Sequence, residues 1–173
     1  MAKPIRQVRK TLLIVCEGAR DELFLQHLRM LYLREPGAVS MVIRRSDGGG
    51  GNGVCKRLMT IDGQYDRYLA MFDGDRPPDA DWLSRVERFR AKGNTVEKLA
   101  ICPQCLEGMI LGLLDQKAHE TSEKCKKGLA RYSNKADWLL NDFQRHLPRE
   151  LLDSRRAQVQ PLDGLLTIML DWG

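Results

Sequence analysis

Four short apolar runs alternate with segments of helical periodicity, and this alternation is the feature that most limits the fold. Helical spacing is clear in residues 19–32 and 80–92, where apolar side chains recur at intervals of three and four. Because strands that alternate with helices are typical of parallel sheets covered on both faces, we expect an α/β fold with a four-stranded parallel sheet flanked by helices. The expected strands are residues 11–16, 39–43, 68–72 and 96–101.

The other segments complete this expected order. The glycine run of residues 48–53 indicates a loop, because it follows the second strand and lacks the Lys-Ser/Thr pair of a phosphate-binding P-loop. After the fourth strand the chain has poor strand potential, so we expect a mainly helical C-terminal part. Further helices are expected at residues 54–61, 106–114, around 120–132, 135–146 and 162–172. We therefore expect a single domain over residues 1–173, with a core at about 10–115 and a helical extension at about 116–173.

Composition excludes several protein classes. The 173 residues, 43% of them hydrophobic, suffice to bury a core. No apolar run approaches the roughly 20 residues of a membrane-spanning helix, and the first strand leads into Glu17 with no signal-peptide cleavage site. Five cysteines, an odd number, do not indicate a disulfide framework. These features predict a cytoplasmic protein without membrane association.

Charge is distributed unevenly along the chain. Lys and Arg total 28 against 23 Asp and Glu, which gives a net charge of +5. The first ten residues and the segment 117–135 are basic, whereas residues 62–81 contain six aspartates. Basic flanks around an acidic centre suit a polyanion bound beside a metal site. The alternative is an ordinary solvated surface.

Acidic residues follow three of the expected strands. Parallel strands end at one edge of a sheet, where ligands bind in such folds. Asp73 and Asp75 flank Gly74, a spacing that in extended backbone directs both carboxylates to one side. Mg²⁺ prefers such oxygen ligands, and Glu17 after the first strand would complete the set or handle a proton. These residues predict a metal site, with a simple polar turn as the alternative.

The motifs that contain these acids resemble the Toprim superfamily of topoisomerases, primases and OLD-type nucleases. Leu12–Gly18 is followed by Asp21-Glu22, and Leu69–Asp75 ends in Asp-Gly-Asp. The superfamily signature is a glutamate after the first strand and Asp-x-Asp after the third. Ile101–Leu111 resembles the RloB-like branch, where a Phe-Glu pair opens an apolar helix, although Leu106 replaces the aromatic residue and Gly108 departs from the pattern. The resemblance covers about residues 10–135.

This resemblance implies a Toprim-like, Rossmannoid fold and a Mg²⁺- or Mn²⁺-dependent nuclease, a nucleic-acid phosphodiesterase of a group associated with phage defence. By motif position, Glu17 would be the general acid or base, while Asp73 and Asp75 would ligate the metal and complete the catalytic set. Glu22 and Glu107 match further acids of the two motifs, and either would hold a second cation.

The resemblance also implies partners. The expected partner is DNA or RNA, and the basic candidates for phosphate contacts are Arg20, Arg76 and Lys135, with ordinary surface charge as the alternative for each. A homo-oligomer, or a partner protein encoded elsewhere, is also expected. The alternative function is a non-catalytic Toprim-fold subunit of a defence complex that binds nucleic acid or protein.

Cysteine and histidine supply the competing signals. Cys102 and Cys105 form a C-x-x-C pair that, with His119 and Cys125, would supply four zinc ligands or a redox pair. Buried structural thiols are the favoured interpretation, because a single C-x-x-C is a weak signal. His27 lies among apolar helix residues and is expected in the core. The three tryptophans are spaced as helix anchors, which favours core packing over base stacking.

Overall fold

The computed structural model describes residues 9–34, 39–101, 104–133 and 137–172. Within these ranges, four strands form one parallel sheet in the order β2-β1-β3-β4. The strands are β1 (Lys10–Cys16), β2 (Val39–Arg45), β3 (Arg67–Asp73) and β4 (Val96–Ile101). The predicted α/β fold and the predicted parallel strands are thus confirmed.

Helices connect the strands and make up the rest of the described chain. They are α1 (Ala19–Tyr32), α2 (Gly50–Thr60), α3 (Ala80–Arg90), α4 (Leu106–Leu113), α5 (Ser122–Ala130), α6 (Leu140–His146), α7 (Arg149–Arg155) and α8 (Gln160–Leu170). The helical C-terminal part is confirmed, although α7 was not anticipated and α6 begins five residues after the expected position 135. None of the helices in the described ranges has the length and apolar character needed to cross a membrane.

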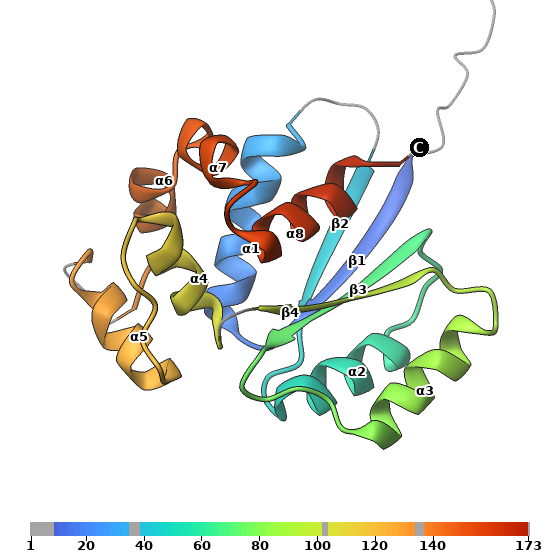
Figure 1. Cartoon of the computed structure of the whole chain (residues 1–173). Coiled ribbons are helices and arrows are strands. Elements are labelled where there is room, and N and C mark those ends of the chain that lie inside the picture. Colours follow the sequence, from blue (N-terminus) through green and yellow to red (C-terminus); the bar gives the residue numbers. More distant parts are fainter. Residues whose placement is uncertain (1–8, 35–38, 102–103, 134–136, 173) are drawn as a thin grey trace, which may run out of the picture.

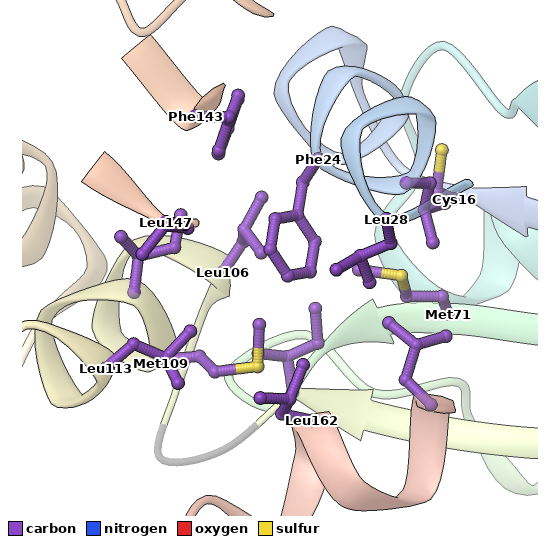
Figure 2. Close-up of a cluster of buried hydrophobic side chains, with 14 of the residues drawn as sticks. Cys16, Phe24, Leu28, Met71, Leu106, Met109, Leu113, Phe143, Leu147 and Leu162 are labelled. Carbon is purple, nitrogen blue, oxygen red and sulfur yellow. The ribbon is translucent and has the colours of Figure 1, made fainter. Parts of the chain in front are cut away.

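Each face of the sheet has its own helical layer. Alternate residues of a strand point to opposite faces. Leu12 and Ile14 of β1 therefore pack with α1 and the C-terminal helices, whereas Leu13 and Val15 pack with α2 and α3. Figure 1 shows these two helical layers on opposite faces of the sheet. In the larger core, Phe24 of α1 lies close to Leu106 of α4 (Figure 2). All four strand residues are fully buried, so the sheet holds the two layers in fixed positions.

The glycine run corrects one expectation, because its second half is helical. Helix α2 begins at Gly50, not at Val54. A Cβ at Gly51 would lie 2.4 Å from the ring of Pro78, and one at Gly53 would lie 2.0 Å from the carbonyl oxygen of Gly48. These close approaches need glycine, and they outweigh its poor helix propensity. The first turn of α2 is thereby held against the segment that follows β3.

Buried residues that carried competing functional interpretations belong to the core. His27 is buried and its Nε2 lies 2.8 Å from the carbonyl oxygen of Leu147, which confirms the predicted core position. Trp138 is also buried, and its indole N–H donates to the carbonyl of Leu129 at 3.1 Å. The described cysteines, which are Cys16, Cys55, Cys105 and Cys125, are free thiols in buried positions. Cys102 lies outside the described residues.

Candidate functional site

A cleft lies at the carboxyl ends of β1 and β3, the two inner strands of the sheet. From β1 the chain enters α1 on one face of the sheet, and after β3 it enters α3 on the other. Connections that leave adjacent strands toward opposite faces open a crevice between the strand ends, which is where ligands bind in such folds. The cleft has a volume of about 360 Å³, and Glu17, Asp21 and Asp73 are among its lining residues.

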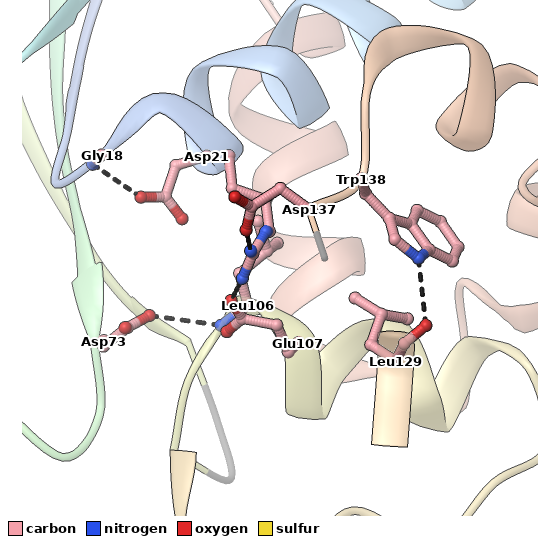
Figure 3. Close-up of polar contacts among 9 residues, drawn as sticks. Gly18, Asp21, Asp73, Leu106, Glu107, Leu129, Asp137 and Trp138 are labelled. Atoms are coloured by element: carbon pink, nitrogen blue, oxygen red, sulfur yellow. Dashed lines mark hydrogen bonds and ion pairs between the residues drawn. The ribbon is translucent and has the colours of Figure 1, made fainter. Parts of the chain in front are cut away.

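Glu17 and Asp73 are held together by the backbone of the two strands. The backbone N–H of Asp73 donates to Glu17 Oε1 at 2.9 Å. The Asp73 carboxylate in turn accepts from the backbone N–H of Leu106, the first residue of α4, at 3.2 Å (Figure 3). A helix N-terminus favours a negative charge at this place. The predicted convergence of Glu17 and Asp73 at one edge of the sheet is thus observed.

Asp21 is a third acid of the cleft, and its position was not anticipated. It is the third residue of α1, and its Oδ2 accepts from the backbone N–H of Gly18 at 2.8 Å (Figure 3). An acidic side chain three positions into a helix commonly reaches back to the residue that precedes the helix. The spacing Gly18-x-x-Asp21 was therefore the available signal, although the motif position had indicated Glu22.

Crowding of these acids changes their protonation. Burial, followed by the nearby charges of Asp21 and Glu17, raises the pKa of Asp73 to about 7, although the Leu106 N–H opposes the shift. Burial also raises the pKa of Asp21 to about 6. The Gly18 N–H opposes that shift, and the charge of Glu17 reinforces it. Two partly buried carboxylates thus titrate near neutral pH, as in sites that bind cations or transfer protons.

Two other predicted acids have cationic partners of their own. Glu22 does not line the cleft, and it pairs with Arg45 at 3.5 Å. Glu107 does line the cleft and is only 4% exposed, but the guanidinium of Arg20 binds it and also Asp137 (Figure 3). Because Arg20 is occupied in this way, it ties α1 to α4 and to the C-terminal part. Its predicted phosphate contact would require one of these ion pairs to open.

Asp75 does not join Asp73 in the cleft. The chain turns after β3, because the N–H of Gly74 donates to Ile101 and that of Asp75 to Gln104, both at 3.1 Å. The exposed Asp75 carboxylate then accepts from the hydroxyl of Ser122 in α5. The backbone after Asp73 is therefore a turn and not extended as expected, and Asp75 lies outside the cleft lining, although its charge contributes to the raised pKa of Asp73.

Of the three predicted basic residues, Arg20 lines the cleft, where Glu107 and Asp137 occupy its guanidinium. Arg76 is exposed, and its backbone carbonyl accepts from the N–H of Gly51 at 2.9 Å. It is not among the cleft residues, and Lys135 lies outside the described residues. Lys126 of α5 does line the cleft, and its positive charge partly opposes the rise in the pKa of Asp21. It belongs to the basic segment that the sequence had indicated only as a whole.

The donor set suits a hard divalent cation bound by few protein ligands. In the part of the chain that the structure describes, no three acidic, thiol or imidazole side chains are grouped so as to hold a metal ion. Mg²⁺ commonly takes only one or two carboxylates and fills its remaining positions with water and substrate phosphate oxygens. Asp73 together with Glu17 or Asp21 meets that smaller requirement.

The zinc and redox alternatives stay predictions, because Cys102, one half of the C-x-x-C pair, lies outside the described residues. The described part of the chain contains no metal-binding group of cysteines and histidine. Burial raises the pKa of the Cys105 thiol to about 11, as expected for a buried structural thiol.

The chain was also compared with known proteins. No protein-family model matches it, and neither a curated protein nor a solved structure is significantly similar. What the structure itself establishes is an α/β fold with a parallel sheet in the order β2-β1-β3-β4 and a helical C-terminal part.

Proposed function

We propose that the protein is a divalent-metal-dependent nucleic-acid phosphodiesterase with a Toprim-like core. The observation that carries the proposal is the meeting of Glu17 and Asp73 at the crevice between β1 and β3, joined by a hydrogen bond of 2.9 Å. The raised pKa of Asp73, about 7, supports it, since a bound cation would relieve the crowding of negative charge. The sequence resemblance to RloB-like proteins further supports a role in phage defence in the cytoplasm.

Each side chain of the cleft has its own role in the proposed reaction. Asp73, with Asp21, would hold Mg²⁺ or Mn²⁺, which when bound supplies charge neutralisation at the phosphate and a more acidic water. Glu17 is fixed at Oε1 by the Asp73 N–H, so its Oε2 is the atom that takes up or gives a proton. Lys126 supplies positive charge for the phosphate. In this assignment Asp21 takes the place of Glu22, and Asp75 acts only if it leaves Ser122.

A cleavage assay tests this proposal. The purified protein is incubated with labelled single-stranded DNA, duplex DNA and tRNA in Mg²⁺, in Mn²⁺ or in EDTA. We expect metal-dependent cleavage of at least one substrate. Cleavage should fall at least a hundredfold in Glu17→Gln, the loss typical of a missing acid–base group, and should also fall strongly in Asp73→Asn, which removes a metal ligand. Glu22→Gln is the matched control, because Glu22 pairs with Arg45 outside the cleft. Activity that persists in Asp73→Asn would overturn the assignment.

A non-catalytic subunit is the second candidate function. The observation in its favour is that Arg20 is occupied by Glu107 and Asp137, so the cleft offers little free positive charge to a phosphate. Nucleic-acid binding without turnover in either metal, for all three substrates, would favour this candidate over the phosphodiesterase.

A further inference from the structure

A groove runs between α2 and α3 and continues the cleft. Its first part has a volume of about 470 Å³ and shares Gly48 with the cleft. Its second part, of about 740 Å³, shares Lys56, Thr60 and Trp82 with the first. The two helices lie together on the face of the sheet opposite the C-terminal helices (Figure 1). A path for a ligand therefore leads from the carboxylates across the glycine run and along α2.

Hydrogen bonds fix where this groove begins. The N–H of Gly51 donates to the carbonyl of Arg76 at 2.9 Å. Asn52 and Asp79 exchange two bonds, in which the Asn52 amide donates at 2.9 Å and the Asp79 N–H donates at 2.8 Å. The N-terminal ends of α2 and α3 are thus joined beside the turn that follows Asp73. Because α2 has 11 residues, the groove follows a helix about 16 Å long.

The groove is basic. Five cations line its two parts, and the described lining residues include no acid. The cations are Lys56, Arg57, Arg85, Arg88 and Lys92. Arg85 pairs with Asp81 at 2.8 Å, whereas no ion pair to a described residue is formed by the other four. Glu87, the other acid of α3, is neutralised by Lys98 and Arg90. Such a surface attracts a chain of phosphates.

Aromatic side chains accompany the cations. Trp82 and Phe89 are partly buried against the core beneath the sheet and also line the groove. The guanidinium of Arg85 lies over the Trp82 ring, 4.7 Å from its centroid. Aromatic rings interleaved with cations are typical of surfaces that bind single-stranded nucleic acid, because unpaired bases stack on the rings while the backbone follows the charges. A duplex hides its bases and gains nothing from the rings.

We propose that the groove between α2 and α3 binds a single strand of nucleic acid and guides it toward the carboxylate cleft. The part of this inference that directs the nucleic-acid strand toward the carboxylates rests on the proposed function. Binding itself needs neither metal nor catalysis. The groove surface is distinct from the predicted phosphate contacts, since Arg20 and Arg76 are not among its lining residues.

Binding of a fluorescent 12-nucleotide strand in EDTA, measured by anisotropy across a salt series, tests the proposal. Lys56→Gln with Arg88→Gln removes two exposed cations of the groove. Each lost phosphate contact lowers the salt slope by about 0.7 and, at 0.1 M salt, the affinity by about fivefold. We therefore expect a slope reduced by about 1.4 and binding weakened about 25-fold. Trp82→Leu should weaken binding of the strand about five- to 150-fold with an unchanged salt slope.

A matched control removes the same charge elsewhere. Arg34→Gln with Arg145→Gln changes two exposed arginines outside the groove, neither of which forms an ion pair to a described residue, and should bind the strand as the wild type does. Equal losses in the two double variants would overturn the proposal, as would wild-type affinity in the groove variant. A wild type that binds duplex more tightly than the single strand, or that binds only an acidic peptide, would also overturn it.

The cleavage assay distinguishes failure of this proposal from failure of the proposed function. If the protein shows metal-dependent cleavage but the groove variants bind the strand as the wild type does, only the groove proposal is refuted. Groove-dependent binding without any cleavage refutes the phosphodiesterase alone.

Discussion

Replacement of Asp73 by Asn should stabilise the metal-free protein above neutral pH. The carboxyl has a pKa of 3.8 in a model peptide and about 7 in the folded protein, so folding binds a proton between these values. The stability that this proton contributes is fully present below about pH 4 and is lost as the pH rises through 7. A difference of about three pKa units corresponds to about 4 kcal/mol, which partial exposure to solvent reduces to about 2 kcal/mol.

The measurement is a series of thermal melts in EDTA from pH 5 to pH 8. At pH 8 the Asp73→Asn protein should melt about 4 to 8 °C above the wild type, and at pH 5 the difference should shrink. The Asn side chain keeps a carbonyl oxygen for the Leu106 N–H, so this hydrogen bond is retained. Glu150→Gln removes one exposed charge from α7 and is the control for net charge.

Metal provides the second part of the same experiment. Mg²⁺ or Mn²⁺ at a hundredfold excess over its Kd should stabilise the wild type by about 2.7 kcal/mol, and the Asp73→Asn protein much less. An Asp73→Asn protein that melts below the wild type at pH 8 would contradict the prediction. A wild type whose stability does not change between pH 5 and pH 8 would contradict it equally.

Two further predictions concern stability. Arg20→Met leaves the buried Glu107 carboxylate unpaired and should lower the free energy of unfolding by about 3 kcal/mol in urea titrations, while addition of Glu107→Gln should recover part of that loss. An Arg20→Met protein as stable as the wild type would contradict this. Gly51→Ala should cost about 1 to 3 kcal/mol because its Cβ would lie 2.4 Å from Pro78, whereas Gly112→Ala in α4, where no atom lies within 4 Å of the added Cβ, should be neutral or stabilising. Equal effects of the two alanines in thermal melts would contradict this, because they would show that Pro78 moves away from the added Cβ at little cost.

Much of the fold was predictable because the alternation of strands and helices extends over about 90 residues. The meeting of Glu17 with Asp73 followed from the same pattern, since parallel strand ends share one edge. The choice between Asp21 and Glu22 depends on helix phase. Adjacent residues of a helix point about 100° apart, and the order of residues in the motif does not say which of the two acids faces the cleft. The direction of Asp75 was likewise unpredictable, because the hydrogen bonds of its turn go to residues near Ile101.

The hydrogen bond between the Asp73 N–H and Glu17 has a consequence for how the sequence can change. Ile14 of β1 is paired with Leu69 of β3, and both side chains are fully buried. A single residue inserted within β3 would turn its buried side chains to the opposite face and move Asp73 by about 3.3 Å along the strand. The same insertion at residues 62–66, before β3, would leave the positions of Glu17 and Asp73 unchanged. We therefore expect insertions to be tolerated outside the strands and not within them, because the distance between the two acids depends on the register of the strands in the hydrophobic core.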